Sequence, residues 1–258
     1  MTDEWTGGLV LSPDDWEGDE LGTRLLQVAE AAASQPVLVE AVFGENTLRD
    51  ISILEEGLRV SRTVGRVTRG PGTGFLIAQD LLMTNNHVLP NAGIAEGEEV
   101  WFNYQRSSRS NAMLPEKYVL DPDGFFYTNI ELDFSVVRVK GDPGLKWGFL
   151  LLQNQNPRAG TAAIVIQHPN GKRKKISLGD NEIKEIVAGG AKLQYLTDTM
   201  PGSSGSPIFD EAFNLIGLHH ASTLTPDKLR YFRNEGIHIN AIIANLPDEV
   251  PTGEDLDA

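Results

Sequence analysis

A serine held between glycines is the strongest chemical signal in this sequence. Residues 202–207 read Gly-Ser-Ser-Gly-Ser-Pro, and an apolar strand is expected directly after them. A serine hydroxyl attacks a carbonyl carbon efficiently when a base takes its proton and backbone N–H groups hold the oxyanion that forms. Gly202 permits the tight turn that aims such N–H groups at one point, and Gly205 keeps bulk away from Ser204. The stretch predicts a nucleophilic serine, although taken alone it also fits a plain turn between two strands.

A histidine and an aspartate earlier in the chain could supply the base and the carboxylate that orients it. His87 follows an apolar strand and the polar residues 84–86, so we expect its ring to face a cleft at the end of that strand. Asp133 opens an apolar strand, and a carboxylate in apolar surroundings needs a partner. Taken singly, His87 also fits a core histidine and Asp133 a turn cap. Together with the serine, they form the set His, Asp, Ser that an activated serine requires.

These motifs resemble those of trypsin-like serine peptidases with two β-barrels and, among them, the bacterial glutamyl endopeptidases. The matching segments are residues 72–77, 84–88, 132–134, 202–207 and 216–219, within a span of about 60–246. Ser206 stands where most trypsins and HtrA-type proteases carry glycine, which favours the glutamyl branch. The resemblance implies an all-β chymotrypsin-like fold of two six-stranded antiparallel β-barrels, here with a small N-terminal helical extension.

The resemblance also implies a role for each candidate residue. Ser204 would attack a peptide carbonyl, His87 would accept and later return the proton, and Asp133 would orient the imidazole. The backbone N–H groups of Gly202 and Ser204 would form the oxyanion hole. The expected activity is that of a serine endopeptidase that forms an acyl-enzyme intermediate with a protein or peptide substrate.

Two further residues match the pocket that holds a substrate carboxylate in glutamyl endopeptidases. His219 and Thr199 can both donate hydrogen bonds to a carboxylate without a full buried charge pair. His219 also fits an ordinary core residue of the expected strand 215–219. The family usually follows this histidine with tryptophan and glycines, whereas this chain has residues 220–222, His-Ala-Ser. A preference for glutamate before the cut is therefore a hypothesis that rests on two side chains.

The remaining histidines do not predict a metal site. His219 and His220 are neighbours on an expected strand, so their rings should point to opposite faces. His168 and His238 lack the spacing of metal ligands with one another or with carboxylates. We expect no metal and no cofactor.

Charge narrows the classes of partner. The formal net charge of −14 should repel nucleic acid, so we expect no nucleic-acid partner. One basic run, Lys172–Lys175, follows a Pro-Asn-Gly turn in an expected hairpin. Such a run usually forms a solvated face. The alternatives are a docking site for an acidic partner and a patch that draws acidic substrates to the enzyme.

The N-terminus and the composition bear on location. Residues 1–5 show neither the positive region nor the apolar region of a secretory signal, and no apolar run could span a bilayer. Cysteine is absent, so no disulfide is expected. We expect a cytoplasmic bacterial protein with no membrane partner.

The chain divides into three expected regions. These are a partly helical extension at 1–59, a peptidase domain at 60–246 with barrels at about 60–140 and 144–246, and an acidic, disordered tail at 247–258. Helices are expected over 19–34 and 47–56, the second with Leu48, Ile51 and Leu54 facing inward. Residues 58–65 hold two arginines and fit a cleavable linker. We expect the extension to regulate the enzyme or to dock an activating partner.

Strands are expected wherever short apolar runs are bounded by turn residues. In the first barrel they cover 66–69, 74–78, 81–83, 99–103 and 133–140, with a polar connection over 104–126. In the second they cover 163–167, 176–178, 183–187, 194–197, 207–210, 215–219 and 236–240, before a short helix at 241–246.

Two other functions are compatible with this fold. One is a peptide-binding module that has lost turnover, which the presence of all three triad residue types opposes. The other is an HtrA-like quality-control protease, which is weakened because no second domain follows the barrels in this sequence.

Overall fold

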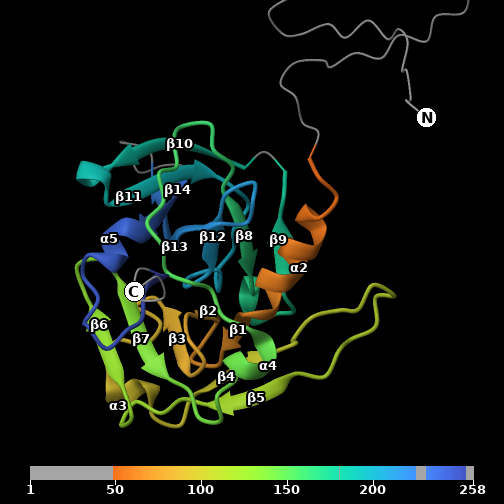
Figure 1. Cartoon of the computed structure of the whole chain (residues 1–258), viewed down its shortest axis with the longest axis vertical. Helices are drawn as coiled ribbons and strands as arrows, with labels where there is room; N and C mark the ends of the chain where they lie inside the picture. Colours follow the sequence, from red (N-terminus) through yellow and green to blue (C-terminus); the bar gives the residue numbers. More distant parts are fainter. Residues whose placement is uncertain (1–48, 180, 225–230, 254–258) are drawn as a thin grey trace, which may run out of the picture. The chain divides into compact units, whose positions relative to one another are not determined.

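The computed structural model describes residues 49–179, 181–224 and 231–253. The helix expected at 19–34 lies outside these residues, as does most of the N-terminal extension. Ile51 opens the compact unit that contains both sheets, which Figure 1 shows as a lower and an upper assembly of strands.

The first sheet is an antiparallel barrel that one isolated bridge closes. Its strands are β1 (Val64–Val67), β2 (Gly72–Leu76), β3 (Leu81–Thr84), β4 (Glu99–Phe102), β5 (Glu116–Val119), β6 (Phe126–Asn129) and β7 (Phe134–Arg138). They pair in the order β5-β4-β1-β2-β3-β7-β6. Leu120, just after β5, bridges Val139, just after β7. Six strands therefore form the ring, and β6 pairs with β7 outside it.

The second sheet repeats this plan. Its strands are β8 (Ile164–Gln167), β9 (Lys175–Ser177), β10 (Glu182–Val187), β11 (Lys192–Leu196), β12 (Pro207–Phe209), β13 (Leu215–Leu224) and β14 (Tyr231–His238). The order is β10-β11-β14-β13-β12-β8-β9, and Ala162 bridges Glu182 to close the ring. The expected two-barrel, all-β fold is confirmed, with a seventh strand beside each six-stranded ring.

Some strands differ from the predicted ones because their sequences carry a weak apolar pattern. β5 reads Glu-Lys-Tyr-Val and has no fully buried residue, so the polar connection predicted over 104–126 hides an edge strand. β6, which follows that segment, is also only half-buried along its length. β13 runs five residues beyond its predicted end, and β14 begins five residues before its predicted start, because these parts of the two strands pair with each other.

The helices are short apart from α2. They are α2 (Ile53–Arg62), α3 (Ala92–Ala95), α4 (Gly144–Trp147) and α5 (Ile239–Ile243), with 3-10 turns η2 (Pro169–Gly171) and η3 (Ala188–Gly190). α5 begins two residues before the predicted C-terminal helix. None of the helices in the described ranges has the length and apolarity needed to cross a membrane.

The predicted position and buried face of the helix at 47–56 were wrong. Helix α2 buries Gly57 and Val60, whereas Ile51 and Leu54 are 78% and 61% exposed. A Cβ atom at Gly57 would lie 2.7 Å from the Phe213 ring, so glycine lets the helix approach the barrel closely. Apolar periodicity does not register a glycine contact of this kind.

The proposed linker at 58–65 is also corrected, because it forms the end of α2 and the start of β1. Its arginines are engaged there: Arg59 pairs with Glu56, and Arg62 donates to the carbonyl of Lys146 at 2.6 Å. Helix α2 therefore runs across the boundary expected between the extension, which was to end at residue 59, and the peptidase domain, which was to begin at residue 60.

Apolar side chains fill each barrel and also join the two barrels. One buried cluster includes Phe75 and Phe134 from the first sheet together with Phe209 and Leu218 from the second. Separate clusters fill the interior of each ring. Burial of this shared core fixes the two sheets against each other.

The prediction of a disordered tail was wrong for residues 247–253. Val250 is 2% exposed, and the N–H of Gly253 donates to the carbonyl of Leu152 at 2.8 Å. The buried Val250 and the bond from Gly253 hold this acidic stretch against the rest of the domain. Residues 254–258 lie outside the described ranges.

Candidate active site

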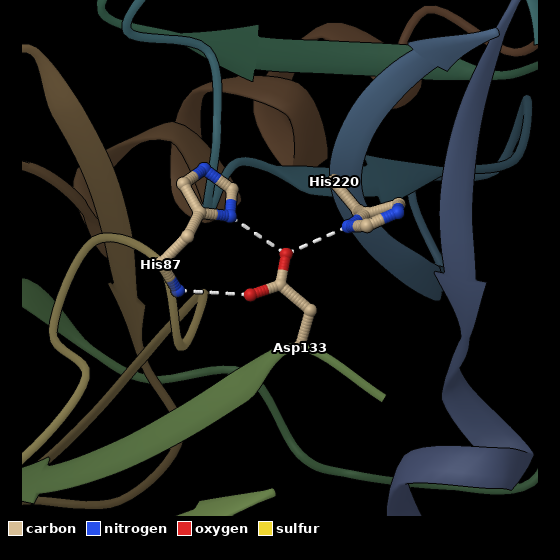
Figure 2. Close-up of side chains that lie close together, drawn as sticks. All are labelled: His87, Asp133 and His220. Atoms are coloured by element: carbon tan, nitrogen blue, oxygen red, sulfur yellow. Dashed lines mark hydrogen bonds and ion pairs between the residues drawn. The ribbon is translucent and has the colours of Figure 1, made fainter. Parts of the chain in front are cut away.

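His87 and Asp133 lie together because β3 and β7 are paired neighbours. Thr84 pairs with Ser135 at the end of this ladder, so the turn after β3 meets the residue before β7. Nδ1 of His87 lies 2.7 Å from Oδ2 of Asp133, and the His87 backbone N–H donates to Oδ1 at 2.9 Å (Figure 2). Two bonds to one carboxylate fix both the position and the orientation of the imidazole.

The Asp133 carboxylate is held in its charged form. The residue is 9% exposed, and its backbone is left-handed with φ of 48°. Burial by itself would raise the pKa of Asp133, but hydrogen bonds from His220 and His87 outweigh burial and hold that pKa well below its usual range. A charged carboxylate requires Nδ1 of His87 to carry the proton, which leaves Nε2 as the base. The His87 side chain is 48% exposed, so a substrate can reach it.

His220 is a functional residue that the sequence reasoning missed. Its Nδ1 lies 2.6 Å from the same Oδ2 of Asp133, on the side opposite His87 (Figure 2). Its Nε2 lies 3.6 Å from Glu235, which in turn binds Lys192 at 2.8 Å. Strand alternation predicts that the neighbouring rings of His219 and His220 point to opposite faces of the sheet. Because the ring of His219 is buried, the ring of His220 points the other way, toward the first barrel.

The Ser204 loop is anchored to the first barrel through β2. The backbone N–H of Thr73 donates to the Ser204 carbonyl at 3.0 Å, and the Thr73 hydroxyl donates to the Gly202 carbonyl at 2.8 Å. The Thr84 hydroxyl donates in turn to the Thr73 carbonyl at 2.7 Å. Thr84 precedes His87 by only three residues. The serine loop and the histidine turn therefore share one anchor.

Two neighbours of Ser204 fix the shape of its loop. Ser203 is fully buried, and its hydroxyl binds the side chain of Gln167 and the carbonyl of Met200. Gly205 has φ of 85°, and a Cβ there would lie 2.0 Å from the Thr73 carbonyl oxygen. Within the described part of the chain, no hydrogen bond joins the Ser204 hydroxyl to the His87 ring.

The two expected oxyanion donors are unoccupied by protein acceptors. Gly202 has φ of 96°, and a Cβ there would lie 2.9 Å from the His168 carbonyl oxygen. Glycine adopts this conformation without a steric cost, whereas other residues do not. Neither the Gly202 N–H nor the Ser204 N–H donates to a backbone acceptor among residues 49–179, 181–224 and 231–253. Both donors are therefore available to a developing oxyanion.

The two residues expected in the specificity pocket have separate hydrogen-bond partners. The Thr199 hydroxyl donates to the side chain of Asn234 at 3.1 Å, and Ser222 donates to the same oxygen at 2.6 Å. His219 is buried, and its Nδ1 lies 2.6 Å from the hydroxyl of Tyr195. Burial lowers the pKa of His219 to about 3, so its ring is neutral. Across the described residues, no hydrogen bond connects His219 to Thr199.

Three side chains of the site could in principle ligate a metal. Ligand atoms of His87, Asp133 and His220 all lie within 4.8 Å of one another. The N···O distances of 2.6 and 2.7 Å are hydrogen-bond distances. Ligands about 2 Å from a tetrahedral zinc stand farther apart than this. Hydrogen bonding therefore accounts for the cluster.

Comparison with known proteins gives one matching family. The family described as trypsin-like peptidase domain matches residues 72–218. An uncharacterized protein of Sinorhizobium fredii, y4fB, is 30% identical over 82% of this chain and 39% of its own length. Secreted RxLR effector protein 73 of Plasmopara viticola is 28% identical over 70% of this chain and 51% of its own length. The chain thus spans about two fifths to half of these relatives.

Solved structures share the fold at low sequence identity. A Glu endopeptidase in complex with MPD has a TM-score of 0.54 at 20% identity, covering 72% of this chain and 89% of that one. The active form of the Rv3671c protease from M. tuberculosis has a TM-score of 0.55 at 16% identity, covering 83% and 95%. The serine endoprotease from Yersinia pestis also has a TM-score of 0.55 at 16% identity, covering 76% and 66%.

Proposed function

The chain belongs to the trypsin-like peptidase family, and on that premise we propose that it is a serine endopeptidase with Ser204, His87 and Asp133 as its catalytic triad. The observation that carries the proposal is the 2.7 Å contact between Nδ1 of His87 and the charged carboxylate of Asp133. This contact leaves Nε2 unprotonated and oriented, which is what a general base for a serine needs.

The mechanism follows from these groups. Oγ of Ser204 attacks the peptide carbonyl carbon as Nε2 of His87 takes its proton, and Asp133 stabilises the imidazolium. The N–H groups of Gly202 and Ser204 receive the oxyanion. The tetrahedral intermediate then collapses, and the leaving amine takes the proton from His87. Water hydrolyses the acyl-enzyme through the same steps and frees Ser204.

A fluorophosphonate probe tests this triad directly, because it reacts only with an activated serine. We expect the wild-type chain to be labelled and Ser204→Ala to be unlabelled and inactive. The neighbouring variant Ser206→Ala is the control, and it should keep the label. Loss of label in His87→Ala would tie reactivity to the base. Peptide binding without cleavage or labelling in the wild type would instead support a catalytically silent binding module.

We further propose that the enzyme prefers glutamate before the cut, through Thr199 and His219. Burial raises the pKa of Tyr195 well above its usual value, so its hydroxyl stays protonated and can donate to Nδ1 of His219. The neutral imidazole then carries its proton on Nε2, which can donate to a substrate carboxylate. Cleavage sites in a denatured proteome report this directly: cleavage mainly after arginine or leucine would contradict the proposal.

The third element of the proposal is regulation of a bacterial cytoplasmic enzyme by a partner that binds the N-terminal extension (1–59). In its support, Ile51, just before α2, and Leu54 and Leu58 within α2 are 78%, 61% and 70% exposed. Exposed apolar rows of this kind mark interaction sites. Removal of residues 1–48 spares α2 and should change kcat/KM in the presence of a cell extract. Equal activity of the full and shortened chains in buffer and in extract would reject regulation.

A further inference from the structure

A cluster of cations and aromatic rings lies beside the serine loop. We call it the basic platform, and it consists of Arg66, Trp101, Tyr104, Lys172 and Arg173. The Arg66 guanidinium lies 4.9 Å from the centre of the Trp101 ring, and that of Arg173 lies 5.1 Å from the centre of the Tyr104 ring. The two rings meet edge to face at 5.7 Å. Cation–π contacts thus hold both guanidinium groups in fixed positions.

The cations of the basic platform lack a carboxylate. Among the described residues, Arg66, Lys172 and Arg173 form no ion pair, and the Nε atoms of both arginines are buried without an acceptor. Lys117 also lies over the Trp101 ring, but it is 3.8 Å from Glu99. Unpaired cations are unexpected in a chain with a net charge of −14. The arrangement is that of an anion site for which the described residues supply no ligand.

The basic platform adjoins the oxyanion loop. A Cβ at Gly171 would lie 3.2 Å from Nε of Arg66 and 3.6 Å from Pro71. A Cβ at Gly202 would lie 3.0 Å from both the Gly171 nitrogen and Pro71. The Asn170 N–H also donates to the Pro201 carbonyl at 2.5 Å. Gly171 of the η2 turn therefore lies close to both the Arg66 side chain and Gly202.

The sheet order places the basic platform on one side of the serine. Thr199, which is expected to contact the residue before the cut, binds Asn234 of β14, as does Ser222 of β13. The η2 turn and Lys172 lie between β8 and β9, and β12 separates β8 from β13 in the strand order. In the proposed peptidase, a substrate that crosses Ser204 from the side of β13 would therefore continue toward the η2 turn.

We propose that the basic platform binds acidic side chains in the substrate segment that follows the scissile bond, which makes acidic polypeptides the substrate class. The inference rests on the proposed peptidase function. Guanidinium groups bind carboxylates with two parallel hydrogen bonds, which the ring-held geometry favours. The negative charge of the rest of the molecule repels such a segment elsewhere and so concentrates its binding here.

Paired peptides test the proposal kinetically. Two quenched fluorescent peptides share every residue up to the cut and then continue with Asp-Glu-Asp or Asn-Gln-Asn. We expect kcat/KM to be about tenfold higher for the acidic peptide at low ionic strength, with the advantage shrinking as salt is added. In the double variant Lys172→Gln/Arg173→Gln, the ratio should fall to about one. The double variant Lys140→Gln/Lys184→Gln carries the same charge change elsewhere and should keep the wild-type ratio. Equal rates for both peptides in the wild type, or equal effects of the two double variants, would overturn the proposal.

A binding measurement separates this proposal from the proposed function. In Ser204→Ala, fluorescence anisotropy should show tighter binding of the acidic peptide than of the neutral one, and Lys172→Gln/Arg173→Gln should abolish the difference. If the wild type cleaves neither peptide while this preference holds, the basic platform stands and the peptidase proposal fails. If Ser204→Ala binds the acidic and the neutral peptide equally well, the proposal for the basic platform fails. Tighter binding of a single-stranded oligonucleotide than of the acidic peptide, at one ionic strength, would also overturn the proposal in favour of nucleic acid.

Discussion

At the scale of single residues, the unusual feature of this site is that one carboxylate oxygen accepts from two imidazoles. Oδ2 of Asp133 lies 2.7 Å from His87 and 2.6 Å from His220. The second imidazole also faces Glu235, so it connects the carboxylate to charges in the second barrel. His220 touches no reacting atom, and we assign it a positioning role through Asp133.

His220→Ala should lower kcat by about tenfold to a hundredfold, since hydrogen bonds to a buried charge contribute about 1.5–3 kcal/mol each. Loss of this donor frees the Asp133 carboxylate to move and so misorients His87, which should lower kcat while KM stays close to the wild-type value. His220→Asn keeps a donor and should restore part of the rate. His238→Asn is the control, because His238 caps α5 away from the site. A change confined to KM in His220→Ala, or no recovery of kcat in His220→Asn, would contradict the positioning role.

Gly205→Ala should destabilise the fold by about 3 kcal/mol or more. The new Cβ would lie 2.0 Å from a backbone oxygen, and φ of 85° disfavours any side chain. Gly179→Ala is the matched control, because nothing lies within 4 Å of its Cβ and its φ is not positive. Urea midpoints compare the two, and an equal midpoint shift in both would refute the assignment.

The sequence indicated the three residues of the proposed triad because each one stands at a strand end next to a recognisable motif. Strand alternation places the ring of His220 on the face opposite His219, but the sequence could not show its contact with Asp133, because that contact depends on how the two barrels pack against each other. The same holds for Thr73, whose backbone and hydroxyl anchor the serine loop from the other sheet. Contacts between the barrels depend on the tertiary structure, which local sequence patterns do not determine.

At the scale of elements, apolar periodicity was reliable for buried strands and misleading at the surface. β2 and β3 are buried at every position and were predicted closely. β5 is a half-exposed edge strand, and it was predicted as a loop. Helix α2 shows the opposite error. Its face with the most regular apolar pattern was predicted to be buried, but it is exposed.

Substitutions on the two faces of α2 separate these interpretations. Val60→Ala should lower the free energy of unfolding by about 2 kcal/mol, because Val60 is fully buried in the shared core. Leu54→Ala should change it by less than about 0.5 kcal/mol, because this residue is 61% exposed. Chemical denaturation of each variant measures both changes. A larger loss in the free energy of unfolding for Leu54→Ala than for Val60→Ala would instead support the buried face predicted from the sequence.

At the scale of the whole molecule, two buried neutral histidines couple folding to pH. Burial lowers the pKa of His219 to about 3, and burial aided by the nearby charge of Lys174 lowers that of His168 to about 3. In the unfolded chain these rings take up protons near pH 6.5. Between these values the unfolded state holds more protons, so the free energy of unfolding falls as the pH falls.

The free energy of unfolding should therefore drop by about 2 kcal/mol for each buried histidine between pH 7 and pH 5. The lowered pKa of Asp133 adds a further loss only below about pH 4, where the unfolded carboxyl protonates. Urea denaturation at pH 7 and pH 5 measures the drop, and His219→Gln should remove about half of it. A drop of the same size in that variant would show that His219 is not held neutral.

The double anchorage of the serine loop on Thr73 has a consequence for self-protection. Any motion that separates the two barrels must break the hydrogen bonds from Thr73 to Ser204 and Gly202, because these bonds connect one barrel to the other. In the proposed peptidase, Ser204 would therefore lose its position as soon as the barrels separate. A copy that starts to unfold would lose its activity at that step and could not cleave the proteins around it.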